Sequence, residues 1–286
     1  MNILGATADT TEYPARSRRR LPPTARVGFL IVGAVVLAAL FAPWLAPQDP
    51  LAQHLGDRLA APTLTHLLGT DSLGRDVLSR LLVGARSTLL LVSLVALCMV
   101  PIGLLVGVVS GYYGGWIERL LNGLTNIVMA FPTLILALAF VGLLGPGLVN
   151  AALALVLTRW PAYARLARNE SLLLRHSDYL AAAEMQGITG LRLLWGHVLP
   201  ACIPAVQIRL ALDLSSIILT AAALGFLGLG VRPPTPEWGM MIADGSKVVF
   251  DQWWIAAVPG TAIFVVSLAF NLIADGLRDW GDPRHG

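Results

Sequence analysis

The chain carries little charge and almost no lysine. Only 13% of its 286 residues are charged, about half the share of a soluble domain. The single lysine, Lys247, lies between Ser246 and Val248, so the sequence lacks the Gly-Lys-Ser/Thr turn that binds nucleotide phosphates. It also lacks an HExxH motif, a GxSxG motif and a carboxylate pair on a shared predicted face. We therefore expect a chain that is no enzyme and binds no cofactor itself.

Cysteine is equally scarce. Cys98 and Cys202 are the only two, and neither belongs to a CxxC motif or lies beside a histidine. Neither a metal site nor a disulfide framework is therefore indicated. The net charge of +3 comes from arginines that flank apolar segments rather than lining one face, which argues against nucleic acid as a partner.

Apolar residues dominate what remains. They make up 56% of the chain and form six stretches, each near the ~20 residues that a bilayer core requires. We therefore predict an all-α integral membrane protein that contacts lipid through six transmembrane helices. The six predicted spans are Val27–Leu45, Ser87–Val109, Leu120–Leu143, Leu148–Leu166, Pro204–Leu224 and Ile255–Ile273.

Arginine placement predicts the orientation. Five arginines precede the first span and place the N-terminus in the cytoplasm, and six spans return the C-terminus to the same side. These arginines are Arg16, Arg18, Arg19, Arg20 and Arg26. Pro43, Trp44 and Pro47 occupy the region around the end of the first span, where a small-residue cleavage site would lie, so this span is expected to be a retained anchor. We expect a multi-pass protein of the cytoplasmic (inner) membrane.

Four segments follow from this topology. Residues 1–26 form a cytoplasmic tail, and residues 27–85 hold the first span and an extracytoplasmic segment. Residues 86–275 form a core of five spans, and residues 276–286 form a second cytoplasmic tail.

A polar insert, Tyr179–Pro200, separates the fourth and fifth predicted spans. Three alanines and Glu184 form a short helix-prone run that Gly187 ends. A second short amphipathic run, Leu191–Val198, follows and is expected to end at Pro200. Two short helices on the cytoplasmic face of a membrane protein predict a docking surface.

The segment His66–Arg86 lies in the extracytoplasmic part. Asp71 and Ser72 are suited to cap and turn the chain. Helical spacing of the apolar residues between Val77 and Leu82 predicts a short helix that lies flat on the outer membrane surface. Such a helix either contacts a substrate or only braces the first two spans.

Small and polar residues within the spans mark contacts. Gly103, Gly107 and Gly111 repeat every four residues and predict a close helix contact, either with a partner subunit or within the chain. Five polar residues lie in or at the ends of apolar stretches, where an unpaired charge costs about 3 kcal/mol. They are Asn122, Asn126, Arg159, Arg209 and Asp213. The last two are four residues apart, so they either pair with each other or line a translocation pathway.

Four motifs resemble those of the inner-membrane permeases of ATP-binding-cassette (ABC) importers, in particular the dipeptide, oligopeptide and nickel family. The polar insert is similar to the family's EAA loop at Ala182, Ala183, Gly187 and Pro200, whereas Ala181 occupies the position of the glutamate. The other three motifs are His66–Arg86, Gly225–Gly245 and Phe270–Arg284.

The resemblance implies the type I ABC importer fold and import of di- or oligopeptides by alternating access. It implies four partners: a homologous second permease, two cytoplasmic ATPases that bind ATP and Mg, and an extracytoplasmic solute-binding protein. Nickel complexes and glutathione are alternative cargoes. An ion-driven secondary transporter and a membrane-embedded enzyme are the alternatives from other classes.

The resemblance also assigns roles to residues. Contacts with the binding protein and the outer gate fall to Asp71, Arg75, Asp76, Pro234 and Trp238, and we expect Asp71 and Glu237 to be accessible to crosslinkers. The ATPase dock comprises Tyr179, Ala181, Ala182, Ala183, Glu184, Gly187 and Pro200. Glu184 follows Ala181 by three residues and shares its helix face, so it either replaces the missing carboxylate in part or is simply solvated.

Overall fold

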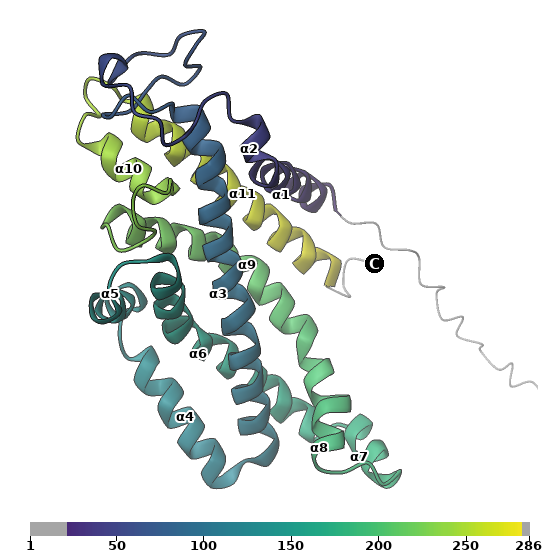
Figure 1. Cartoon of the computed structure of the whole chain (residues 1–286). Coiled ribbons are helices and arrows are strands. Elements are labelled where there is room, and N and C mark those ends of the chain that lie inside the picture. Colours follow the sequence, from purple (N-terminus) through teal and green to yellow (C-terminus); the bar gives the residue numbers. More distant parts are fainter. Residues whose placement is uncertain (1–21, 282–286) are drawn as a thin grey trace, which may run out of the picture.

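The computed structural model describes residues 22–281, and within them the chain is helical without a β-strand (Figure 1). The helices that cross the body of the molecule are α1 (Pro23–Leu40), α3 (Val77–Tyr113), α4 (Gly115–Met129), α5 (Thr133–Leu144), α6 (Leu148–Arg175), α9 (Leu199–Phe226) and α11 (Trp254–Gly281). Shorter elements are α2 (Ala42–Leu45), η1 (Leu55–Asp57), α7 (Asp178–Met185), α8 (Leu191–Leu193), η2 (Leu194–Val198) and α10 (Trp238–Ser246).

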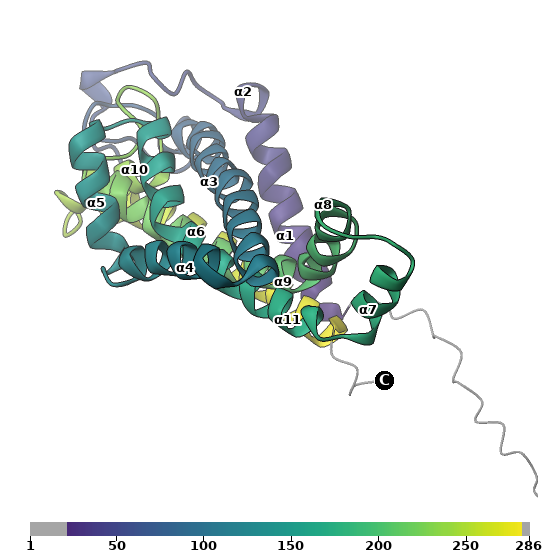
Figure 2. The same cartoon turned by 90° about the horizontal axis from the view of Figure 1, so that it is seen from below.

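Two ends of the molecule carry its polar elements. The start of α3 lies beside α10, and we call this the α10 end; the opposite end, where α7 and α8 lie, is the α7 end (Figure 1). Helices α1 and α5 lie on opposite sides of α3 in both views (Figures 1 and 2).

The first and last helices form an antiparallel pair. A Cβ atom on Gly276, near the end of α11, would lie 3.0 Å from Cα of Ala25, at the start of α1. One on Gly28 would lie 2.6 Å from the carbonyl oxygen of Ala269. The two backbones therefore touch where only glycine fits, which places the start of α1 and the end of α11 at the same end of the molecule.

The helix at the first predicted span ends earlier than expected. Helix α1 ends at Leu40, and the chain enters the separate short helix α2 after Phe41. Pro43 explains the break, because its ring has no N–H to continue the hydrogen bonding of α1 and is favourable only in the first turn of a new helix.

Helix α3 corrects two predictions at once. The residues expected to lie flat on the membrane, Val77–Leu82, form its first turns and continue without interruption through the predicted second span. The N-cap is Asp76 rather than Asp71 or Ser72, because its carboxylate accepts the Ser79 N–H at 2.8 Å. The result is one helix of 37 residues.

The three regularly spaced glycines of α3 face α6 of the same chain. Cβ atoms on Gly103, Gly107 and Gly111 would lie within 2.7 Å of atoms of Trp160, Ala167 and Ser171, respectively. Of the two alternatives for this motif, the structure supports packing within the chain. The contacts advance in the same direction along both helices, so α3 and α6 run parallel.

Helices α4 and α5 replace the predicted single span Leu120–Leu143. They meet at an angle of 90° across Ala130–Pro132. Pro132 lacks the N–H that would continue α4 and disfavours a helical conformation for Phe131, so the helix breaks there. Because α3 and α6 run parallel, this bent pair must return the chain to the α10 end, where Arg232 Nε donates to the Pro146 carbonyl at 2.7 Å.

The prediction of six spans is not confirmed. Four helices of residues 22–281 are long and apolar enough to cross a membrane, and five if the bent pair counts as one span. Helix α6 falls short because Arg159, Arg165 and Arg168 interrupt its apolar residues.

The predicted segment limits stay a prediction. Those after residues 26, 85 and 275 lie within α1, α3 and α11, so the structure has no hinge there. Most of the predicted tail at residues 1–26, and residues 282–286 of the second tail, lie outside the described residues.

Candidate functional site

A buried ion cluster lies at the start of α3. The carboxylate of Asp71 pairs with Arg75 Nε at 2.7 Å and with Arg80 Nε at 3.4 Å. It also accepts the backbone N–H groups of Leu73 and Arg75 at 2.9 and 3.0 Å, which turns the chain into the helix. All three charged residues are less than 10% exposed. One buried carboxylate thus pairs with two buried guanidinium groups.

Asp76 organises the neighbouring turn. Besides capping α3, its carboxylate accepts from the Ser79 hydroxyl at 2.7 Å and lies 3.0 Å from His66 Nδ1. The residue is 3% exposed. Asp71 and Asp76 were predicted to face a binding protein. In the structure, their carboxylates instead bind residues of the same turn and of α3.

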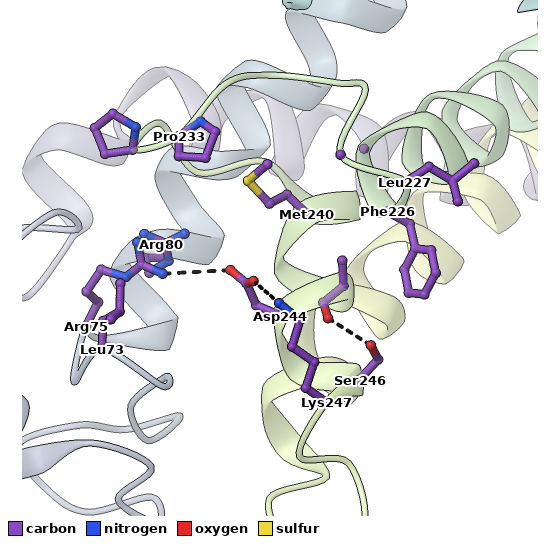
Figure 3. Close-up of a pocket in the computed structure, with 14 residues that line it drawn as sticks. Leu73, Arg75, Arg80, Phe226, Leu227, Pro233, Met240, Asp244, Ser246 and Lys247 are labelled. Atoms are coloured by element: carbon purple, nitrogen blue, oxygen red, sulfur yellow. Dashed lines mark hydrogen bonds and ion pairs between the residues drawn. The ribbon is translucent and has the colours of Figure 1, made fainter. Parts of the chain in front are cut away.

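A hollow of about 570 Å³ opens beside this cluster (Figure 3). Arg75 and Arg80 lie on one side of it, and Asp244 and Lys247 of the α10 segment lie on the other. Arg75 Nη2 is 3.8 Å from Asp244, which also pairs with Lys247 at 3.4 Å. Pro234, on the same hollow, is the one exposed residue of the five predicted to form the outer gate.

Glu237 and Trp238 are buried against α3, contrary to the prediction. The Trp238 ring donates to the Leu81 carbonyl of α3 at 2.9 Å. The Glu237 carboxylate caps α10 by accepting the N–H groups of Gly239 and Met240 at 2.8 and 3.0 Å. Burial raises the pKa of Glu237, while these bonds and one from Thr88 lower it, and burial has the larger effect. A crosslinker at Glu237 or Asp71 would therefore be buried.

At the α7 end, α7 projects from the body with little of its surface covered (Figures 1 and 2). The Ser177 hydroxyl caps it by accepting the Leu180 N–H at 3.4 Å. Within α7, only Leu180 and Ala183 are buried. Ala183, which was predicted to belong to the dock, therefore points inward. The remaining predicted dock residues of this segment are exposed: Tyr179, Ala181, Ala182, Glu184 and Gly187.

Gly187 ends α7 as predicted, at a φ of +81° that disfavours residues with a side chain. Its N–H donates to the Glu184 carbonyl at 2.9 Å. The second predicted run, Leu191–Val198, was expected to end at Pro200, but the helix continues past it. It passes through the π-helical turn η2 into α9, where Pro200 lies in the first turn. The wider turn accommodates a proline ring that would otherwise crowd the preceding carbonyl groups.

A second hollow, of about 320 Å³, lies where the break between α4 and α5 faces α6 and α9. It brings together three of the five polar residues predicted within the spans, namely Arg159, Arg209 and Asp213. Arg209 Nε pairs with Asp213 at 2.9 Å, and both residues also line the hollow, so pairing and lining are compatible.

The other two polar residues lie apart from this hollow. Asn126 is exposed on α4, where its side-chain oxygen accepts from Arg165 Nη2 at 3.1 Å. Asn122 lies one turn earlier and is half-buried.

Sequence reasoning missed several residues that build these sites. Arg80 and Asp244 complete the ion cluster, and Ser216 and Thr220 of α9 hold Arg159. A signal for the last two was present, because two hydroxyl residues four apart in an apolar helix share one face. Asp244 carried no such signal, since nothing in its local sequence indicates which arginine it faces.

Comparison with known families places these features in context. The model of the binding-protein-dependent transport system inner membrane component matches residues 99–285. The model of the N-terminal TM domain of oligopeptide transport permease C matches residues 18–62.

Similar proteins cover nearly the whole chain. The di/tripeptide transport system permease protein of Pseudomonas aeruginosa is 44% identical over 90% of this chain and 87% of its own length. The dipeptide transport system permease protein of Escherichia coli is 42% identical over 90% and 88%. The probable D,D-dipeptide transport system permease protein of Escherichia coli is 41% identical over 90% and 86%.

A solved structure, that of the MetNI methionine ABC transporter in inward-facing conformations, is similar in fold. It aligns with a TM-score of 0.54 and 19% identity over 69% of this chain and 96% of that chain. At this identity the similarity concerns the fold alone, and it confirms the predicted all-α membrane fold of an ABC transporter.

Proposed function

The chain belongs to the family of binding-protein-dependent transport system inner membrane components, and on this premise we propose that it is the permease subunit of an ATP-driven peptide importer. The observation that carries the cargo class is the identity of 41–44% to three relatives whose names specify dipeptides or di- and tripeptides. The chain is a multi-pass membrane component rather than a catalyst.

The α7 end is the proposed cytoplasmic side, where the arginine-rich N-terminal segment would also lie. We expect one of the two cytoplasmic ATPases to bind there, because most residues of α7 are exposed and only Leu180 and Ala183 of this helix are buried. ATP binding would then move α7, and η2 would pass this motion to α9 without a break in the helix.

The α10 end is the proposed outer side. A solute-binding protein would contact its exposed residues, such as Pro234 and Lys247 beside the 570 Å³ hollow. Beneath them, Asp71, Arg75 and Trp238 support this surface without forming it. A homologous second permease would complete the pathway, which opens alternately to either side.

The test uses the complex purified through a tag on this chain and reconstituted in liposomes. We expect ATPase subunits to copurify and ATP to drive uptake of labelled dipeptide once the binding protein is added. Nickel complexes and reduced glutathione serve as competing cargoes. Transport of either without dipeptide transport would contradict the proposed cargo, and ion-driven uptake without ATPases would contradict the proposed mechanism.

A further inference from the structure

The hollow between α4, α6 and α9 contains an unmatched charge. Its charged lining residues are Arg159, Arg209 and Asp213, which amount to two cations and one anion. The carboxylate of Asp213 is engaged by Arg209. Within residues 22–281, Arg159 forms no ion pair, so one positive charge is left without a counter-charge.

Neutral groups hold the guanidinium of Arg159 in place. Its Nη1 donates to the Ser216 hydroxyl at 2.7 Å, and its Nη2 donates to the Thr220 hydroxyl at 2.6 Å and to the Ser216 carbonyl at 3.2 Å. Its Nε is buried without a partner. Three of the five N–H groups of an arginine are thus used, and the group is oriented but not neutralised.

An unpaired charge at membrane depth is costly, about 3 kcal/mol on insertion scales, and such residues normally pair with one another. Arg80 at the α10 end follows that rule through Asp71, whereas Arg159 does not. The difference is explained if the counter-charge of Arg159 arrives with a ligand. A volume of about 320 Å³ lies at the lower end of the range of small-ligand pockets, about 300–1,000 Å³, and suits a short molecule.

We propose that this hollow binds the charged termini of a peptide in transit, with Arg159 binding the terminal carboxylate and Asp213 the terminal ammonium. This inference rests on the proposed function and adds the residues that recognise the cargo. The Arg209 side chain is 45% exposed and that of Asp213 is 17% exposed, so Arg209 has room to turn away and release the carboxylate of Asp213. Ser216 and Thr220 are positioning residues, because they fix the guanidinium of Arg159 toward α9.

Recognition of both termini would be independent of the peptide side chains. The backbone ends are common to all short peptides, whereas the apolar lining residues Val128, Met129 and Phe131 offer no directional bond. The site would therefore favour a free carboxylate and a free amine without selecting a sequence.

The test measures binding directly, with the complex in lipid nanodiscs and without the binding protein. Its probes are Ala-Ala, Ala-Ala amide and N-acetyl-Ala-Ala. We expect the unmodified dipeptide to bind to the parent complex more tightly than either blocked form. Arg159→Gln should weaken Ala-Ala binding about 10–100-fold, as expected for a charge-assisted bond, and leave the amide unchanged. Asp213→Asn should instead abolish the difference between Ala-Ala and its N-acetyl form.

Two variants separate recognition from folding. Arg159→Met should not lower the thermal unfolding midpoint, because it removes an unmatched charge from the membrane interior. Arg168→Gln is the matched control on the same helix, where Arg168 pairs with Glu118 outside the hollow, and it should leave peptide binding unchanged. A lower midpoint with unchanged Ala-Ala binding in Arg159→Met would show a structural role and overturn the inference.

Other sources of the carboxylate predict different results. If a partner subunit supplies it, Arg159→Gln should loosen the complex, and Ala-Ala should bind no better than its amide. If the hollow accepts any anion, acetate should displace Ala-Ala at equal concentration. Either result would overturn the inference, whereas ATP-driven Ala-Ala uptake by the parent complex tests the proposed function separately.

Discussion

The α10 end and the polar insert at the α7 end both carry motifs that resemble those of known permeases, yet they differ in structure. At the α10 end, the motif residues Asp71, Arg75 and Trp238 are buried and bonded to one another or to α3. At the α7 end, the motif residues of α7 are mostly exposed, and only Leu180 and Ala183 of that helix are buried. A family motif can therefore belong to a buried framework, which we call the frame, in one place and to an exposed surface in another.

The burial of its residues decides whether a motif belongs to the frame or to the exposed surface. A carboxylate that satisfies two guanidinium groups and two backbone N–H groups, as Asp71 does, has little capacity left for a partner protein. In α7, a helix of eight residues, only two residues are buried, so most of its surface stays exposed. We therefore expect substitutions in the frame to lower stability, and those in the insert to alter coupling with little loss of stability.

The largest effect on the unfolding free energy is expected for Asp71→Asn. The substitution leaves the buried guanidinium groups of Arg75 and Arg80 without their shared carboxylate, which should cost about 3–5 kcal/mol. Thermal unfolding of the purified complex in detergent measures it. Asp57→Asn, at an exposed position near the same end, is the control and should change little. An unchanged midpoint in Asp71→Asn would remove the distinction between frame and surface.

Glu237 makes the frame sensitive to pH. Its pKa in the folded protein is raised by burial above the ordinary value of about 4.3, so folding favours the protonated form. The folded state should therefore gain stability as the pH falls from above the raised pKa to below the ordinary one, and lose it again as the pH rises. Glu237→Gln should flatten this dependence. Unfolding midpoints measured across that window, in parent and variant, test the sign.

A smaller loss of stability, with a large functional effect, is expected at Gly187. Its φ of +81° should make Gly187→Trp cost about 1–2 kcal/mol, although no atom lies within 4 Å of a Cβ there. The bulky ring would stand on the exposed face of the insert and should uncouple ATP hydrolysis from uptake. Gly196→Trp, nearby and equally uncrowded but without a positive φ, separates strain from bulk. Normal coupling in Gly187→Trp would count against the dock.

The smallest effect is expected at Glu184, which is exposed on α7 together with Ala181. If Glu184 partly replaces the missing family carboxylate, Glu184→Gln should weaken ATPase association by about 0.2–1 kcal/mol, as expected for an exposed pair. Ala181→Glu in that background should restore the association. Identical ATPase retention by all three proteins on a tag-bound column would show that Glu184 is only solvated.

Local patterns in the sequence predicted much of this structure. The apolar runs predicted the long helices, Gly187 predicted the end of α7, and the spacing of Gly103, Gly107 and Gly111 predicted a close helix contact. Each of these predictions depends on residues near one another in the chain, or on a glycine at a position where a residue with a side chain is disfavoured.

What the sequence could not provide depends on distant partners. The joining of the outer segment to α3 followed from the cap at Asp76, which competed with a plausible cap at Asp71. The burial of Trp238 depends on Leu81 and Thr88, about 150 residues away. The hollow around Arg159 needs the 90° break between α4 and α5 as well as two hydroxyl groups of α9.

The length of α3 has a mechanical consequence. Its 37 residues extend about 55 Å, well beyond the roughly 30 Å of a hydrocarbon core. The glycine contacts fasten α3 to α6 near the α7 end, while the ion cluster is attached to its opposite end. A helix of that length, pivoting by about 5° at one end, sweeps its other end through roughly 5 Å. In the proposed alternating-access mechanism, a small rotation of α3 at the α7 end would therefore become a displacement of several ångströms at the α10 end.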